Sequence, residues 1–170
     1  MINPSATLIC YFSLCRVYTL LMDRKTLIKT LRNDVATVCV CRKTRETARK
    51  ISRLYDDLLQ PAGIKATQFT LLAAISVQGD ATLTELAESL GMDRTTLSRN
   101  LKPLERRGLI TVSAEGYRRA RSASITDKGV TVMEQALPLW NQAQKTLRKR
   151  IGGETWERIQ GDLNEIAHLI

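Results

Sequence analysis

The chain has 170 residues, enough for one domain whose apolar core needs neither disulfides nor a metal to fold. Its 26 Lys and Arg against 17 Asp and Glu give a formal net charge of +9, which favours a polyanionic partner. Its single histidine, His168, and the lack of a nucleophile elbow or a glycine-rich phosphate loop argue against an enzyme. A metal site is not expected, because no CxxC pair is present and His168 is the only histidine, and no cofactor is expected either.

The amino terminus differs from the rest of the chain. Residues 6–22 are mostly apolar, and no acidic residue precedes Asp23. This run is short for a membrane span, which needs about 20 residues, and it lacks the cleavage site of a secretory signal. We therefore expect no membrane partner. Residues 1–33 are interpreted as an extension that is either without fixed structure or the product of a mis-assigned start, with Met22 as the alternative first residue.

Two helices are predicted next. Apolar residues at helical spacing indicate a long helix over residues 34–60, which Pro61 and Gly63 end. Thr67 is expected to cap a second helix, which contains Phe69 and closes near residue 79.

Residues 82–107 predict two short helices joined by a tight turn. Thr82 and Glu85 have the spacing of a capping box, Gly91 can end the first helix, and Asp93 can cap the second. Two helices connected in this way are typical of a helix-turn-helix, whose second helix enters the major groove of DNA.

The second of these helices has two different sides. One side is an apolar stripe of Leu97, Leu101 and Leu104. The nearly opposite side carries one hydroxyl and three cations: Thr95, Arg99, Lys102 and Arg106. This pattern suits a helix that lies on phosphates and base edges.

A β-hairpin is predicted after this helix. Residues 109–113 and 120–125 are strand-like, and the segment between them contains Gly116, Tyr117, Arg118 and Arg119. A basic hairpin tip can reach phosphates or the minor groove. The 28-residue window 94–121 holds eight Lys or Arg against two Glu, so most of the excess positive charge lies here.

Two further helices are predicted at the carboxyl end. Thr126 is expected to cap the first, which contains Trp140 and tolerates Pro138, and residues 152–153 separate it from the last helix. The last helix carries an apolar stripe of Trp156, Ile159, Leu163 and Ile166. One small head cannot easily bury such stripes at both chain ends, so pairing with a second copy is expected.

The helix-turn-helix and hairpin together resemble a known family. LGMDRTTLSR at residues 90–99, LERRGLI at 104–110, RAR at 119–121 and ITDKG at 125–129 resemble the MarR family of bacterial transcription regulators. The family usually has Asp-x-Arg at the hairpin tip, and this chain has Tyr117-Arg118-Arg119, which keeps only the Arg.

The resemblance implies a mainly α fold. It places a winged helix-turn-helix head with a small β-hairpin wing at residues 62–126, within a MarR-type domain over 34–170. Residues 34–61 and 127–170 would be dimerisation helices. It also implies a cytoplasmic, nucleoid-associated homodimer that binds a palindromic operator in double-stranded DNA. The residues assigned to DNA contacts are Arg94, Thr95, Thr96, Ser98, Arg99, Lys102, Arg106, Arg118, Arg119 and Arg121.

Two inputs could control such a regulator. MarR relatives often bind phenolic or other aromatic acids between the dimerisation helices and the head, which would involve Phe69 and Trp140. Both aromatic residues are also typical of plain core.

The second input is thiol chemistry. Cys39 and Cys41 lie among cations that favour the reactive thiolate. By resemblance to the organic-hydroperoxide repressors of the family, Cys41 takes the position of the sensing cysteine and Tyr55 that of a tyrosine that binds it, while Arg45 and Ala66 replace two further tyrosines. Two residues apart on one helix, Cys39 and Cys41 would not face each other, so a bridge between them is not expected. The alternative is that both are small packed residues.

The sequence therefore predicts a homodimeric repressor released from DNA by a small ligand. The alternatives are a peroxide-sensing repressor of the same family, a non-specific nucleoid protein and a winged helix used for protein contacts. A regulator differs from a coating protein in preferring its operator by about 10³-fold or more over random DNA.

Overall fold

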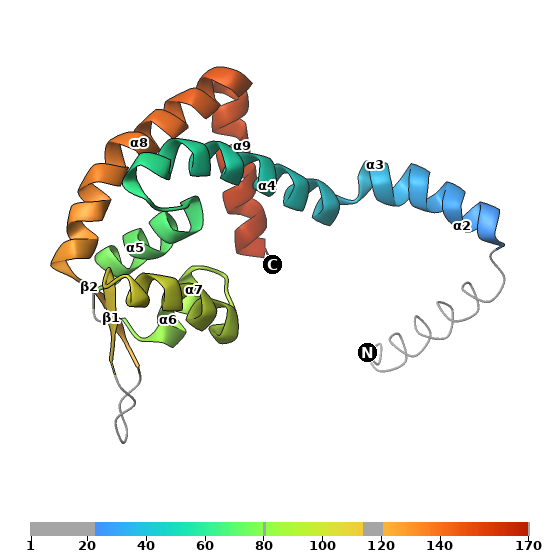
Figure 1. Cartoon of the computed structure of the whole chain (residues 1–170). Coiled ribbons are helices and arrows are strands. Elements are labelled where there is room, and N and C mark those ends of the chain that lie inside the picture. Colours follow the sequence, from blue (N-terminus) through green and yellow to red (C-terminus); the bar gives the residue numbers. More distant parts are fainter. Residues whose placement is uncertain (1–22, 80, 114–120, 170) are drawn as a thin grey trace. The chain divides into compact units, whose positions relative to one another are not determined.

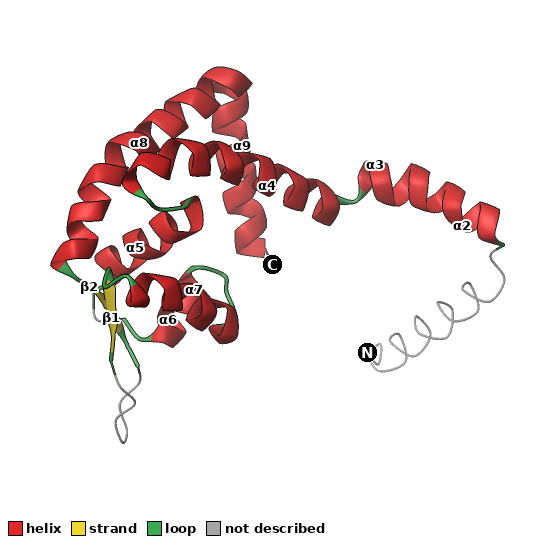
Figure 2. Ribbon diagram, in the orientation of Figure 1, coloured by secondary structure: helices red, strands yellow, loops and turns green. Residues whose placement is uncertain are grey.

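The computed structural model describes residues 23–79, 81–113 and 121–169, which form helices and one two-stranded hairpin (Figures 1 and 2). The chain divides into two compact units, residues 1–49 and 50–170, and each is described by itself. Among the described residues, no helix has the length and apolar character needed to cross a bilayer. The mainly α architecture with a small hairpin, predicted from the sequence, is confirmed.

The first unit is a series of short helices that leads into α4. Asp23 caps α2 (Arg24–Thr30), which is followed by a π-helical turn, η1 (Leu31–Val35), and by α3 (Ala36–Val38). The next residue, Cys39, has an extended backbone with φ −63° and ψ 108°, and α4 (Val40–Leu59) begins after it. The predicted uninterrupted helix over residues 34–60 is therefore wrong at its start.

Local hydrogen bonds explain how the chain tolerates this break. The amide of Lys43 donates to the carbonyl of Cys39 at 3.1 Å, so Cys39 takes the place of a helix cap. Arg42 donates from its guanidinium group to the carbonyl of Ala36 on the other side of the break, and it also pairs with Glu46 at 3.2 Å. A side chain thus satisfies a carbonyl that the interrupted helix leaves open.

The second unit begins with the rest of α4 and turns sharply. A short 3-10 helix, η2 (Gln60–Ala62), leads to Gly63, whose φ of 67° is a conformation that favours glycine. Helix α5 (Ala66–Gln78) follows, one residue before the predicted cap Thr67. The reason is a contact from outside the helix, because Oδ1 of Asp56 accepts a hydrogen bond from the first amide of α5 at 2.7 Å.

The core of this unit lies where α5, α6 (Leu83–Ser89), α7 (Arg94–Arg106) and α8 (Asp127–Ile151) meet the hairpin. Its fully buried large side chains are Leu59, Leu71, Leu72, Ile75, Leu86, Leu97, Leu104, Leu109 and Ile110. Phe69 and Trp140 stack on the edge of this core, with ring centroids 5.8 Å apart.

The hairpin and α8 are built against each other. Strand β1 (Ile110–Val112) pairs antiparallel with β2 (Ala123–Ile125), both shorter than predicted. The hydroxyl of Thr126 accepts from the amide of Gly129 at 3.1 Å, which confirms the predicted cap of α8. Gly129 is buried against the residue before β1, and a Cβ there would clash with the carbonyl oxygen of Leu109 and lie 2.6 Å from Cγ1 of Ile125.

Helix α8 runs to Ile151 with Pro138 inside it, as the sequence predicts, and Gly152 separates it from α9 (Gly153–Leu169). In Figure 1, α8 lies along one edge of the second unit and α9 turns back from its far end. No residue of α9 that the structure describes is buried.

Candidate nucleic-acid interface

The candidate interface begins at the capping box of α6. The amide of Glu85 donates to Oγ1 of Thr82 at 3.2 Å, and the amide of Thr82 donates to Oε2 of Glu85 at 2.8 Å. The amide of Thr82, and its hydroxyl at 2.9 Å, both donate to this carboxylate and hold the pKa of Glu85 below its usual value, with the backbone bond as the largest cause. The predicted capping box is confirmed, and it fixes the direction in which the helix-turn-helix starts.

The turn between α6 and α7 is also as predicted. Gly91 has φ 59°, and Asp93 caps α7 by accepting from the amide of Thr96 at 2.8 Å. The hydroxyl of Thr96 donates to the same carboxylate at 2.7 Å and is the largest cause of the lowered pKa of Asp93. The hydroxyl proton of Thr96 is therefore engaged in capping, although the sequence assigned this residue to DNA contacts.

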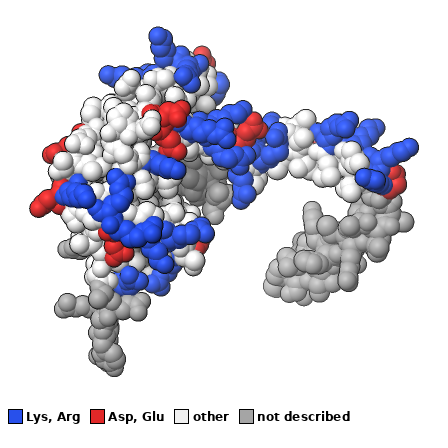
Figure 3. Space-filling view, viewed as in Figure 1, with Lys and Arg blue, Asp and Glu red and all other residues white. Residues whose placement is uncertain are grey.

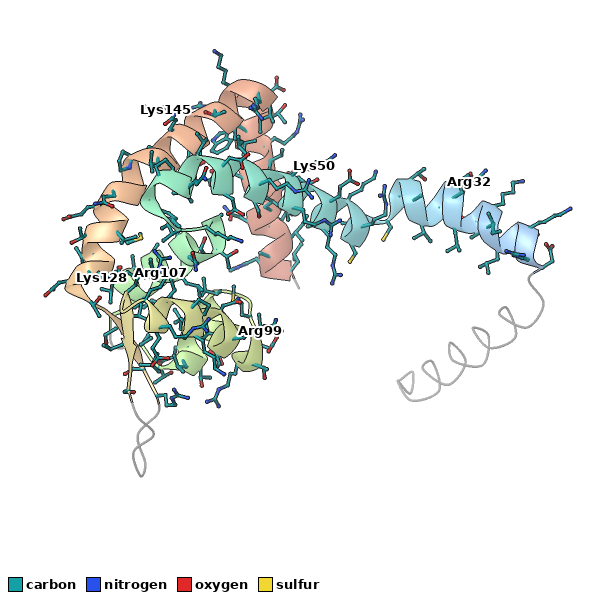
Figure 4. All side chains as sticks on the ribbon, viewed as in Figure 1. Arg32, Lys50, Arg99, Arg107, Lys128 and Lys145 are labelled. Atoms are coloured by element: carbon teal, nitrogen blue, oxygen red, sulfur yellow. The ribbon has the colours of Figure 1, made fainter. Side chains whose placement is uncertain are left out.

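Helix α7 divides into the two predicted faces. Leu97, Leu101 and Leu104 are between 0% and 2% exposed. Arg94, Thr95, Arg99, Lys102 and Arg106 are all exposed, and Ser98 is half-buried. Figure 3 shows Lys and Arg side chains gathered over the part of the head that holds α7, and Figure 4 labels Arg99 on this helix. The structure thus brings four of the ten assigned residues, Thr95, Arg99, Lys102 and Arg106, together on one exposed helix face, and it exposes Arg94 at the start of the helix.

The wing is described only at its base. Arg118 and Arg119, which the sequence assigns to the wing tip, lie outside the described residues. Arg121 is half-buried: its Nε donates to the carbonyl of Ser113 at 3.4 Å, and its own carbonyl accepts from the amide of Leu83 at 2.8 Å. Arg121 therefore ties the base of the wing to the start of α6.

The assigned sensor residues occupy different environments. Cys41 is exposed and Cys39 is half-buried at the break before α4. Because Cys39 lies outside the helix, the expectation that both thiols stand on one helix is wrong. Tyr55 is half-buried against the core, and its burial raises the pKa of the phenol.

The two aromatic residues assigned to a ligand pocket contact each other directly. The rings of Phe69 and Trp140 are nearly parallel, with 14° between their planes, and Phe69 is buried. Trp140 also contributes to a groove of about 320 Å³ between α8 and α9. The residues that line this groove are Trp140, Asn141, Gln144, Lys145, Arg148, Trp156 and Gln160.

Sequence reasoning missed two features of α7. Pro103 lies inside the helix, where it has no N–H to donate to the carbonyl of residue 99. Arg107, at the end of the helix, hydrogen-bonds a distant loop. The proline could be read from the sequence, whereas the hydrogen bond of Arg107 joins residues that are 44 positions apart.

Comparisons with known proteins agree with this geometry. Residues 62–120 match the sequence model of the MarR family. The crystal structure of the M. tuberculosis transcriptional regulator MosR in complex with DNA is 37% identical, with a TM-score of 0.69, over 77% of this chain and 95% of that chain. No sequence in a search of curated proteins matches the chain.

Two more distant structures share the fold. A mutant of MarR from E. coli in complex with operator DNA is 24% identical, with a TM-score of 0.67, over 76% of this chain and 94% of that one. BpsR of Bordetella bronchiseptica, whose DNA binding is regulated by 6-hydroxynicotinic acid, is 20% identical, with a TM-score of 0.69. The match covers 78% of this chain and 96% of BpsR. The chain therefore belongs to the MarR family of winged helix-turn-helix DNA-binding transcription regulators, a family without enzymatic activity.

Proposed function

We propose that the chain is a homodimeric repressor that reads a palindromic operator through α7 and leaves the DNA when a small ligand binds. The observation that carries the proposal is the division of α7 into a buried leucine stripe and an exposed cationic face. Arg94, Thr95, Ser98 and Arg99, nearer the amino end of α7, would contact bases, and Lys102 and Arg106 would hold phosphates. Arg118 and Arg119 would bring the wing to the DNA.

The surface of α9 supports a dimer. Ile159, Leu163, Ile166 and Leu169 are between 38% and 77% exposed. Side chains at this spacing form one apolar stripe along the helix. Leaving such a stripe in water is unfavourable, and a partner that covers it removes this cost. A second copy is the simplest cover, because it would bring an identical stripe and would place two α7 helices about one DNA turn, ~34 Å, apart.

The groove between α8 and α9 supports a ligand. Its volume of about 320 Å³ lies at the lower end of the range for small-molecule sites. Trp140 and Trp156 supply flat apolar surfaces, and Lys145 and Arg148 supply positive charge, although Arg148 also pairs with Glu157 at 3.1 Å. Oε1 of Gln144 is buried there and lacks a hydrogen-bond partner among the described residues. An aromatic acid with a hydroxyl donor would match this lining, and Phe69 would hold the Trp140 ring in place.

The test uses the duplex that the full-length protein enriches from a random library. Its affinity is compared with that of a shuffled duplex by fluorescence anisotropy, with and without 4-hydroxybenzoate and related aromatic acids. A preference of about 10³-fold or more, lost when an acid is added, supports a ligand-released repressor. Equal binding to both duplexes would instead indicate a protein that coats DNA.

Thiol sensing is the second candidate, and the exposure of Cys41 favours it. A peroxide can reach an exposed thiol and oxidise it to the sulfenic acid. The same titration is therefore repeated after cumene hydroperoxide treatment, with the Cys41→Ser and Cys39→Ser variants as controls. Loss of operator binding that a thiol reverses and Cys41→Ser prevents would place the sensor at Cys41.

A further inference from the structure

The recognition helix ends in two neighbouring arginines with different surroundings. Arg106 is exposed and makes no hydrogen bond or ion pair with any residue that the structure describes. Arg107 is exposed too, but its Nη1 donates to the carbonyl oxygen of Gly63 at 2.9 Å. The two residues therefore carry the same charge but do not have the same freedom to reach DNA.

The acceptor of this hydrogen bond is held firmly. Gly63 lies at the corner between α4 and α5, between the buried side chains of Ala62 and Ile64. Nη2 of Arg107 lies 3.6 Å from the position that a Cβ of Gly63 would occupy, so the guanidinium group rests against this residue. The corner is anchored in the core by these two buried side chains, and the hydrogen bond from Arg107 attaches the end of α7 to the corner.

The main chain around Arg107 is held from the other side. Nζ of Lys128, in the first turn of α8, donates to the carbonyl of Arg107 at 2.8 Å. The hydroxyl of Thr126 donates to the next carbonyl, that of Gly108, at 2.7 Å. Figure 4 shows Arg107 and Lys128 next to each other at this junction. The carboxyl end of α7 is thus attached to both α8 and the α4–α5 corner.

We infer that Arg107 is a positioning residue for operator recognition, which holds α7 at the angle that base contacts require without touching DNA. The inference rests on the proposed function. Base contacts depend on the exact direction of donors and acceptors in the major groove, whereas phosphate contacts tolerate a small shift of the helix. Release of Arg107 from Gly63 therefore weakens operator binding more than binding to random DNA.

The test compares two matched variants, Arg107→Met and Arg106→Met. Methionine keeps an unbranched side chain but removes the charge and the donors. Each variant is titrated with the duplex enriched by the wild-type protein and with its shuffled control, over a series of salt concentrations, after circular dichroism has confirmed folding. For Arg107→Met the ratio of operator to shuffled affinity falls about fivefold or more, and the dependence of log K on log salt stays at the wild-type slope. For Arg106→Met the slope falls by about 0.9, as for one lost phosphate contact, and the ratio is unchanged.

Each other result overturns the inference. A slope that falls in Arg107→Met makes Arg107 a phosphate contact. Wild-type affinity for both duplexes makes the hydrogen bond to Gly63 irrelevant to recognition, and equal losses on both duplexes make it merely structural. If Arg107→Met does not fold, Arg107→Lys takes its place, because it keeps the charge on a shorter side chain. A ratio of operator to shuffled affinity equal to that of the wild type would then overturn the inference. A wild-type protein without any preference contradicts the proposed function instead.

Discussion

Helices α7 and α9 have the same kind of sequence pattern, an apolar stripe with a polar opposite face, but the fold treats them differently. The stripe of α7 is between 0% and 2% exposed because α5, α6 and β1 cover it. The stripe of α9 is between 38% and 77% exposed, because within this chain the helix packs mainly against α8. What remains uncovered on α7 is polar and cationic, whereas α9 leaves its apolar stripe uncovered as well as its polar face.

The difference shows that the uncovered face of an amphipathic helix indicates its partner. A cationic face backed by a filled core suits a polyanion, whereas an apolar face with only one neighbour suits another protein surface. Substitutions on the two helices should therefore affect different measurements, and four predictions test this division.

The largest effect is expected on the buried stripe of α7. Leu104→Ala leaves a cavity at a fully buried position, which should lower the free energy of unfolding by about 2–5 kcal/mol. Urea denaturation measures it, and the loss should not depend on protein concentration. A loss below about 1 kcal/mol would mean that the head is packed more loosely than the structure indicates.

A smaller effect of another kind is expected on α9. Leu163 is 53% exposed in the single chain, so Leu163→Ala should hardly change the stability of the monomer. It should raise the dissociation constant of the dimer about tenfold or more, because burying a leucine contributes about 1.5–3 kcal/mol. Sedimentation at several concentrations measures this constant. An unchanged monomer–dimer equilibrium would remove α9 from the dimer interface.

The third effect concerns the cationic face of α7. Arg99→Ala should weaken operator binding by about 1–3 kcal/mol if Arg99 contacts a base. Binding to a shuffled duplex should change much less, and anisotropy titrations of both duplexes give the comparison. An equal loss on both would make Arg99 a phosphate contact, with unfolding in urea as the control that the core of α7 is intact.

The smallest effect is that of pH on the caps that orient α6 and α7. Hydrogen bonds lower the pKa of Glu85 and of Asp93, so each carboxylate stabilises the folded state above its unfolded-state pKa. This contribution is lost as the pH falls through the lowered folded-state pKa, below about pH 4. Asp93→Asn, which caps a helix without titrating, should be as stable as the wild type at pH 7 and lose less stability on acidification. Identical acid profiles of the two proteins would contradict this role.

The sequence predicts the elements that depend on local chemistry. Thr82, Asp93 and Thr126 cap the helices expected of them, and the leucine spacing of α7 identifies its buried face. These signals suffice because a cap and a stripe involve residues within one or two helical turns of each other.

The contacts that the sequence does not reveal are those between distant segments. Asp56 caps α5 from ten positions away, and Arg107 bonds Gly63 across 44 positions, without any local pattern to mark either. The break at Cys39 has no glycine or proline beside it, and a hydrogen bond from Arg42 to the carbonyl of Ala36 accompanies it. Such contacts are decided by the packing of the whole unit, which single-sequence patterns do not encode.

The close approach of Gly129 to the backbone of Leu109, just before β1, bears on how a ligand would move the DNA-binding head. Because Gly129 has only a hydrogen as its side chain, the first turn of α8 lies directly against the backbone at the base of the wing. The side chain of Ile125 lies beside this contact. A shift of α8 relative to the base of the wing would cause steric clashes at this junction. The base of the wing and the first turn of α8 are therefore expected to move together as one rigid segment. In the proposed dimer, a change in the spacing between the two heads would then come from bending farther along α8, where Pro138 removes one backbone hydrogen bond.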